Sequence, residues 1–387
     1  MFFCSAVIFS TLTPGPSSTS YRVTVGPRVQ PVTAASTLNC SRTDVIESAM
    51  WSLAALRFLG GSPAGEPLDM TELTGITSYE PTELVVTARA GTRLSDLEAA
   101  LEEQGQCLPF EPPRIAAGGT LGGMVASGLS GPARASVGSV RDHVLGVTLL
   151  NGRSEVLTFG GQVAKNVAGY DVSRLMVGAF GVLGILCEVS LKVLPVSIAS
   201  ATLRFDWDET RALEQLGSWS AQPLPINASA WHAGRLHLRL AGARAAVEAA
   251  CVRLGGEQVD PAQAKDWWTR VRDQSDEFFL LDDASLARGE SLWRLSIPAI
   301  TGALALPGQQ FIEWHGAQRW WKTTAGAAQV RDAAARAGGH ATLIRGADKS
   351  HGVFAPISPV LMRVHHDLKQ AFDPARIFNP GRLYAGL

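Results

Sequence analysis

The most regular hydrophobic pattern in the chain lies at residues 185–193, where apolar and polar side chains nearly alternate. One face would carry Ile185, Cys187, Val189, Leu191 and Val193. A period of two predicts a strand with one buried face. Gly178, Gly181 and Gly184 precede this strand. Because glycine weakens helices and strands alike, these three predict a turn made for close backbone approach. Outward-pointing N–H groups in such turns bind phosphate, and a tightly packed turn is the alternative.

Shorter patterns predict further elements upstream of this strand. Residues 83–90 (ELVVTARA) read as a strand. The helix after it has one apolar stripe, formed by Leu94, Leu97 and Leu101. Thr92 or Ser95 is expected to cap that helix, and Ser95 with Glu98 matches a capping box. Residues 144–150 and 155–159 are expected to pair as a hairpin, because Asn151-Gly152 lies between them.

A second glycine-rich stretch, residues 116–146, leads into the hairpin. Its glycines are interleaved with Thr120, Ser127 and Ser130. Small residues allow close backbone approach, and hydroxyls and amides donate hydrogen bonds without a charged side chain. Two such stretches, each beside a strand, predict a bound diphosphate. A bulky residue at Gly122 or Gly181 is then expected to fill the path of the diphosphate. The alternative for residues 116–146 is a small-residue helix packed closely on a sheet.

The middle of the chain contains an internal repeat. Trp231-His232 and Trp314-His315 open two similar runs, and Gly255-Gly256 and Gly338-Gly339 close them at equal offsets. Alanine-rich helical patterns lie between, so we expect two related strand–helix units in a ferredoxin-like sheet. The ten tryptophans of the chain are more than a small core requires, and some are expected at a protein interface.

Arg294 lies in the strand-like segment SLWRLSIP of this middle region. A guanidinium can hold a carboxylate through two parallel hydrogen bonds, so Arg294 is a candidate for binding a substrate carboxylate. An exposed strand arginine or a subunit contact is the alternative.

Composition limits the classes of function. With 387 residues and 46% hydrophobic residues, the chain is long enough for two or three domains with cores of their own. A net charge of −1 argues against a nucleic-acid surface. No apolar run reaches the roughly 18 residues of a spanning helix, and the first residues lack the features of a signal peptide. The five cysteines are scattered, which argues against an iron–sulfur or zinc site and favours a reduced, cytoplasmic protein.

Residues 1–56 differ from the rest in composition. They are rich in Ser, Thr, Val and Pro, and show no convincing periodicity before about Val45. We expect this segment to lie outside the folded domains as a divergent, disordered N-terminus. A frameshifted 5′ coding region and a genuine divergent N-terminus both remain open.

Several motifs carry a resemblance to a known family. TLGGMVASGLSG, SVGSVRDHVLGVTLLNG, KNVAGYD and GAFGVLGILCEVSLKVLP follow one another as in FAD-binding domains of the vanillyl-alcohol-oxidase (PCMH) type. The tail FDPARIFNPGR resembles the 2-hydroxy-acid branch, and GQVAKNVAGYDVSRL and GGHATLIRG resemble the FAD-binding E subunits of bacterial glycolate oxidase. The resemblance implies an α+β fold. Its parts would be a two-part FAD-binding domain at 57–198, a ferredoxin-like cap at 199–350, and a C-terminal segment at 351–387 that returns to the FAD domain.

The resemblance also implies which residues hold FAD. The diphosphate and ribityl region would be lined by Gly119, Thr120, Gly122, Gly123, Ser127, Gly128, Gly138, Ser139 and Asp142. The adenosine end would be held by Gly178, Gly181, Gly184 and the backbone of Ile185. Lys165, Tyr170 and Asp171 lie in the segment between, and Asn379 is a candidate contact to the isoalloxazine. No metal site is expected.

Two departures from the family shape the functional expectation. Family members carry an earlier R-G-G-G-[ST]-K loop, whereas the corresponding place here reads MWSLAALRFLGGSPAGEPLD, with only Gly60 and Gly61 in common. The H-x-x-G-D-G-N-x-H segment of the hydroxy-acid branch is also missing. The resemblance therefore implies an FAD-binding subunit that oxidises glycolate to glyoxylate beside a larger catalytic flavoprotein and an iron–sulfur subunit. Membrane contact is expected only through those partners. The alternatives are a structural subunit with impaired flavin binding and a self-contained FAD oxidase for a small 2-hydroxy acid.

Overall fold

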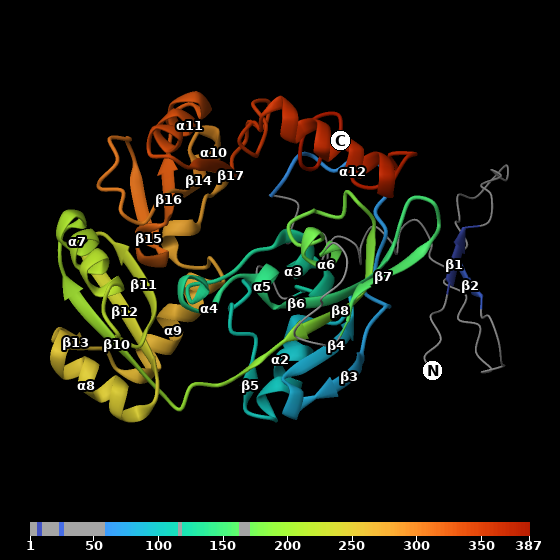
Figure 1. The fold of residues 1–387 in the computed structure, drawn as a ribbon. Helices are drawn as coiled ribbons and strands as arrows, with labels where there is room; N and C mark the ends of the chain where they lie inside the picture. The colour runs from blue at the N-terminus through green and yellow to red at the C-terminus, as the bar shows by residue number, and fades with distance from the viewer. Residues whose placement is uncertain (1–5, 10–22, 27–58, 115–117, 162–170) are drawn as a thin grey trace.

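The computed structural model describes residues 6–9, 23–26, 59–114, 118–161 and 171–387 (Figure 1). A five-stranded and an eight-stranded sheet, each with helices, make up most of the described fold, so the predicted α+β class is confirmed. Within residues 1–56, β1 (Ala6–Phe9) and β2 (Val23–Gly26) pair with each other as a separate two-stranded sheet. No strand was expected in this segment from its sequence. Both strands are short, and Val, Ile, Phe and Thr all favour strands.

The five-stranded sheet lies within residues 57–198, the predicted FAD-binding part of the chain. Its strands lie in the order β3-β4-β8-β6-β7, and each neighbouring pair is antiparallel. The strands are β3 (Ile76–Glu80), β4 (Val85–Arg89), β6 (Val144–Leu150), β7 (Val156–Gly160) and β8 (Ile185–Lys192). The associated helices are η1 (Pro81–Glu83), α2 (Leu94–Glu102), α3 (Leu121–Ser127), α4 (Arg134–Val137), α5 (Val140–His143) and α6 (Val172–Leu175). The predicted hairpin is confirmed as β6–β7, and β5 (Gln106–Cys107) pairs separately with β9 (Leu194–Pro195).

The predicted alternation holds for only half of β8. Val189, Leu191 and Val193 are fully buried, but nearer the glycine turn it is Leu186 that is buried, while Ile185 and Cys187 are partly exposed. The register between β6 and β8 shifts between the Thr148 and Leu149 positions. Such an irregularity inserts an extra residue and turns the following side chains to the other face.

The helix after β4 has the predicted stripe but not the predicted cap. Leu94, Leu97 and Leu101 are buried in the core of the FAD-binding part. The N-cap is Arg93, and it makes no side-chain capping bond. The Thr92 hydroxyl instead accepts the Gly75 N–H at 2.9 Å, and Ser95 donates to Asp96. A tertiary contact thus uses the hydroxyl that the local pattern assigned to capping.

The eight-stranded sheet contains the predicted repeat. Its order, β13-β10-β12-β11-β15-β16-β14-β17, divides into two four-stranded halves joined by antiparallel pairing of β11 and β15. The first unit is β10 (Ala199–Asp206), α7 (Glu209–Ser220), β11 (Ile226–His232), β12 (Arg235–Gly242), α8 (Arg244–Leu254) and β13 (Glu257–Gln258). The second is β14 (Ser291–Ser296), β15 (Gln309–Glu313), η3 (Trp314–Gly316), β16 (Gln318–Thr323), α11 (Ala327–Arg336) and β17 (His340–Arg345). Between the units lie α9 (Pro261–Arg272), η2 (Glu277–Phe279) and α10 (Asp283–Ala287).

Both halves have the strand order of a ferredoxin-like fold, so the predicted cap architecture is confirmed. The third strand, second helix and fourth strand begin at 235, 244 and 257 in one unit, and at 318, 327 and 340 in the other. Each pair differs by 83 positions. The second unit has no helix at the position of α7, between β14 and β15.

Most of the described tryptophans are buried inside the chain, so the expectation of some at an interface stays a prediction that only the partly exposed ones could fulfil. Seven are buried: Trp219, Trp231, Trp268, Trp293, Trp314, Trp320 and Trp321. The two others that the structure describes, Trp207 and Trp267, are partly buried and stack on Phe205 and His237. A wide sheet with helices on both faces has enough interior to take these large rings.

The C-terminal segment packs against the FAD-binding part. α12 (Pro359–Phe372) lies along the five-stranded sheet near β7, drawn in red in Figure 1, and Phe372 contacts Phe159. Beyond the helix, Arg382 accepts the Gly61 N–H at its carbonyl and donates to the Leu59 carbonyl at 2.7 Å. The tail therefore holds the start of the described core, including the Gly60–Gly61 pair.

Candidate FAD and substrate site

The glycine-rich stretch 118–131 forms a short helix packed on the sheet, the alternative reading of that segment. Thr120 is the N-cap of α3 and accepts the Gly123 N–H at 3.2 Å. A Cβ built at Gly122 would lie 2.8 Å from the Ala90 Cβ on the β4 side. Gly122 is thus required for close packing of α3 on the sheet, and the expectation that its missing Cβ clears a diphosphate path is wrong.

Several amides predicted to hold FAD, five at the diphosphate and that of Gly178 at the adenosine end, are already bonded inside the protein. Their acceptors lie 2.7–3.2 Å away, and four of the six acceptors are backbone carbonyls. These amides are those of Gly122, Gly123, Gly128, Gly138, Ser139 and Gly178. A backbone donor that already has a protein acceptor gains little by exchanging it for another acceptor. They are therefore not free donors for a diphosphate.

The glycine turn at residues 178–184 mainly allows close packing. Gly178, Gly181 and Gly184 all have positive φ, which favours glycine. A Cβ at Gly184 would lie 2.2 Å from Leu149, and Ile185 pairs with Leu150 in the sheet. The turn is bound to α3, since Gly178 and Phe180 donate to carbonyls of that helix.

Asn379 lies at this same turn. Its Nδ2 donates to the Phe180 carbonyl at 2.7 Å, and a Cβ at Gly181 would meet that same nitrogen at 2.7 Å. Since Gly181 was assigned to the adenosine end and Asn379 to the isoalloxazine, the two assignments conflict: the opposite ends of FAD cannot occupy one turn.

The remaining predicted residues take local structural roles or lie outside the described residues. Ser139 and Asp142 form a capping box on α5, and the Ser139 backbone N–H holds the pKa of Asp142 below its usual value. Asp171 caps α6 and pairs with Arg174 at 3.0 Å. Ser127 donates to the Met124 carbonyl. Lys165 and Tyr170 lie outside the described residues.

Free space remains beside the backbone at both ends of α3, at Gly119 and Gly178. An extended cofactor would have room there. A Cβ at Gly119, just before α3, would touch only a Leu94 methyl at 3.4 Å. A Cβ at Gly178, which packs against Gly128 at the other end of α3, would meet nothing within 4 Å. A seven-residue helix spans about 10 Å, a length compatible with a dinucleotide lying along it.

Arg294 lies where the cap meets the FAD-binding part. It stands on β14 opposite Trp320, and its side chain is half-buried. Burial lowers the pKa of Arg294 to about 10, Arg134 on α4 acts in the same direction, and Glu313 opposes both. No carboxylate of the described residues lies within ion-pair distance of Arg294 or Arg134. Two guanidiniums near each other without such a partner favour an anionic ligand.

Sequence reasoning missed Arg134, although it is the only charged residue between Gly118 and Val140. Its guanidinium lies 4.4 Å from the Trp314 ring centre, and the Trp314 indole N–H donates to the Gly131 carbonyl. Burial lowers the pKa of Arg134. Trp314 thus joins the cap to the glycine-rich stretch and places Arg134 against the cap sheet.

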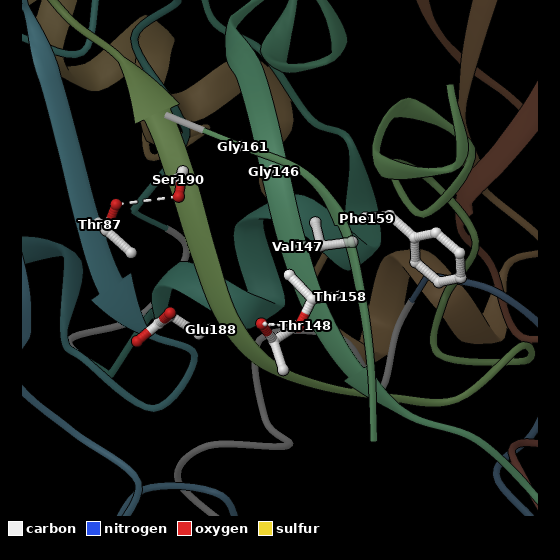
Figure 2. Close-up of a pocket in the computed structure, with 9 residues that line it drawn as sticks. All are labelled: Thr87, Gly146, Val147, Thr148, Thr158, Phe159, Gly161, Glu188 and Ser190. Atoms are coloured by element: carbon white, nitrogen blue, oxygen red, sulfur yellow. Dashed lines mark hydrogen bonds between the residues drawn. The ribbon is translucent and has the colours of Figure 1, made fainter. Parts of the chain in front are cut away.

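A small pocket on the five-stranded sheet is separate from these residues (Figure 2). Its volume is about 150 Å³, and no predicted site residue lines it. Its hydroxyl groups form hydrogen bonds with one another, Thr87 with Ser190 and Thr148 with Thr158. It is too small for FAD, since ligand pockets usually reach about 300 Å³ or more.

None of the helices in the described part of the chain has the length and apolar character of a membrane span, and the described residues offer no metal site. Those residues contain no group of three or more His, Cys, Asp or Glu side chains arranged to hold a metal ion.

Comparison with known proteins identifies the family. Residues 56–160 match the profile described as FAD binding domain, and residues 315–383 match that of the C-terminal domain of FAD linked oxidases. The chain is 48% identical to the glycolate oxidase subunit GlcE of Escherichia coli over 330 residues, which are 85% of this chain and 90% of that protein. It is 34% identical to a D-lactate dehydrogenase of Anaerostipes hadrus over 131 residues, 34% of this chain and 27% of that enzyme.

A solved structure of alkyldihydroxyacetonephosphate synthase shares the fold, with a TM-score of 0.56 at 16% identity over 82% of this chain and 69% of that one. The match to the FAD profile begins at residue 56, where the composition of the chain changes. The chain is therefore an FAD-dependent oxidoreductase of the 2-hydroxy-acid type, and it belongs to the GlcE family of FAD-binding glycolate oxidase subunits.

Proposed function

We propose that this chain is the FAD-binding subunit of a glycolate oxidase complex, and that Arg294 binds the carboxylate of the 2-hydroxy acid. The observation that carries the proposal is the Arg294–Arg134 pair, which has no ion-pair partner among the described residues and lies between the cap and the glycine-rich stretch. A small carboxylate would supply the missing charge and two acceptor oxygens.

FAD, when bound, supplies the two-electron acceptor for the C2 hydride of the substrate. The chain's own residues have a different task. Gly119 and Gly178 leave room along α3, Arg294 orients the acid, and the Trp314–Gly131 contact keeps the cap against the FAD-binding part. In the proposed complex, electrons then pass to an iron–sulfur subunit beside a second flavoprotein, and those partners make any membrane contact.

A structural subunit with weakened flavin binding is the second candidate. It is favoured by the six glycine-loop amides that are already bonded within the fold. Flavin absorbance of the purified full chain separates the two, since a structural subunit would be colourless after FAD addition and gel filtration.

The test of substrate binding uses Arg294→Gln. With the full chain loaded with FAD under anaerobic conditions, we expect glycolate to reduce the flavin. Losing hydrogen bonds to a charged group, at about 1.5–3 kcal/mol each, should raise the half-saturating glycolate concentration about 10- to 100-fold at unchanged FAD content. Arg235→Gln, an exposed arginine on β12 of the same sheet, is the matched control. Equal half-saturation in Arg294→Gln and wild type would refute the assignment.

A further inference from the structure

Four residues of the second ferredoxin-like unit share one face of the cap sheet. Arg294 pairs with Trp320, and Glu313 pairs with Gln318. Gln318 and Trp320 are two positions apart on β16, so all four side chains point to the same side of the sheet. That side is turned toward the FAD-binding part, because Glu313 lies within range of the charge of Glu111 and Arg294 within range of that of Arg134.

Glu313 is a buried carboxylate with only one of its oxygens engaged. Its side chain is 3% exposed. Both donors that reach it, Gln318 Nε2 at 3.0 Å and Trp320 Nε1 at 2.5 Å, bind Oε2. No donor from the described residues reaches Oε1. The neighbouring Gln318 Oε1 is buried and has no hydrogen-bond partner. A buried acceptor without a donor is costly, and Glu313 Oε1 beside it has no donor among the described residues, so a ligand that brings a hydroxyl is favoured here.

We propose that Glu313 takes the hydroxyl proton of the 2-hydroxy acid whose carboxylate Arg294 holds. This inference rests on the function proposed above. As the hydroxyl O–H bond breaks, its proton passes to Glu313 Oε1. The C2–H bond breaks at the same time and the C2–O bond becomes a carbonyl. The substrate thus loses one proton to Glu313 and one hydride, and FAD, when bound, would accept that hydride with its two electrons.

The electrostatics around Glu313 suit a base at neutral pH. Burial raises the pKa of Glu313 to about 7, and Glu111 acts in the same direction. The Trp320 and Gln318 hydrogen bonds and the Arg294 charge oppose that shift. A group with a pKa near the working pH is well placed to exchange a proton in a reaction. Since the base must be ionised, flavin reduction should speed up as the pH rises through about 7.

A purely structural role is the rival explanation. A protonated Glu313 with a rotated Gln318 amide could donate to the amide oxygen, and this would satisfy both groups without any ligand. Comparing two ligands distinguishes the explanations. Glycolate and acetate bring the same carboxylate to Arg294, but only glycolate brings a hydroxyl that stabilises the ionised form of Glu313.

The first measurement follows the protonated carboxyl band by infrared difference spectroscopy between wild type and Glu313→Gln, from pH 5.5 to 8.5. We expect one carboxyl, absent from the variant, that titrates near pH 7, with a lower midpoint in glycolate than in acetate. Equal midpoints in the two ligands would overturn the proposal. This readout needs no turnover, and the ligand comparison on wild type decides alone if Glu313→Gln does not fold.

The second measurement is anaerobic flavin reduction by glycolate in the FAD-loaded full chain. Glu313→Gln should be slower by about a hundredfold or more, the range for loss of a general base, and should lose the inflection near pH 7. Glu248→Gln, an exposed residue on α8, should match wild type. A rate within threefold of wild type in Glu313→Gln overturns the role of Glu313 and leaves the proposed function standing. If no 2-hydroxy acid reduces the wild-type flavin, the proposed function fails, and this inference fails with it.

Discussion

A buried lysine attaches the C-terminal tail to the FAD-binding part, and its removal gives a sharp test of the fold. The Lys369 side chain is 1% exposed, and its Nζ donates to the Val182 carbonyl, to Asp373 Oδ2 and to the Phe378 carbonyl, each at 2.7 Å. Asp373 is fully buried and also accepts the Ile377 and Phe378 N–H groups. Lys369→Met keeps the length of the side chain but leaves Asp373 without its counter-ion.

The expected loss is large. Breaking a buried pair by removing one partner costs about 3–5 kcal/mol, because an uncompensated charge stays buried. The two carbonyls also lose a donor, so the loss should lie toward the upper end of that range. Domains are stable by only about 5–15 kcal/mol in total. In Lys369→Met/Asp373→Asn the stranded charge is gone, and the double variant should be at least about 1 kcal/mol more stable than the sum of the single effects predicts.

Urea denaturation of the full chain, followed by circular dichroism, measures these free energies. Hydrogen exchange at the Gly61 amide, which bonds the Arg382 carbonyl, reports separately on release of the tail. Lys265→Met, at an exposed lysine of α9, is the matched control and should change stability by less than about 0.5 kcal/mol. A loss below about 1 kcal/mol in Lys369→Met, or strictly additive effects in the double variant, would refute the reasoning.

Three further predictions follow from packing, charge and the missing loop. Gly122→Val should destabilise the FAD-free protein by about 1–3 kcal/mol in thermal melts, because its Cβ meets Ala90; equal melting of variant and wild type would contradict this. His237, stacked on Trp267, has its pKa lowered by burial to about 4, so the unfolded chain binds more protons between about pH 4 and 6.5. Folding stability should therefore fall as the pH drops through that window, by up to roughly 3 kcal/mol, and urea titrations of His237→Gln should show a flatter profile. Restoring an R-G-G-G-S-K loop and a family-like N-terminal strand and helix before Arg57 should tighten FAD binding by about a hundredfold or more, at about 1.5–3 kcal/mol for each of about two hydrogen bonds regained; equal dissociation constants would show the departure to be harmless.

The sequence determined what local pattern and repetition can determine. The β6–β7 hairpin was predicted because Asn151-Gly152 favours one turn between two apolar runs. The two ferredoxin-like units were predicted because the Trp-His and Gly-Gly pairs recur at equal offsets. Such predictions agree with the structure because residues close together in the chain specify a turn or a repeated unit.

Only the tertiary structure decided what the glycines and the charges do. Gly122 and Gly184 serve close packing because Ala90 and Leu149, remote in sequence, lie against them. The predicted N-cap of α2 was wrong, because the Thr92 hydroxyl accepts the Gly75 N–H instead. Nothing in the pattern around Glu313 indicated a buried carboxylate on the face of Arg294, since that face arises only when β14, β15 and β16 pair. Burial and strand register are set by segments distant in the sequence. The pKa values of side chains, and which hydrogen-bonding groups lack a partner, depend on both.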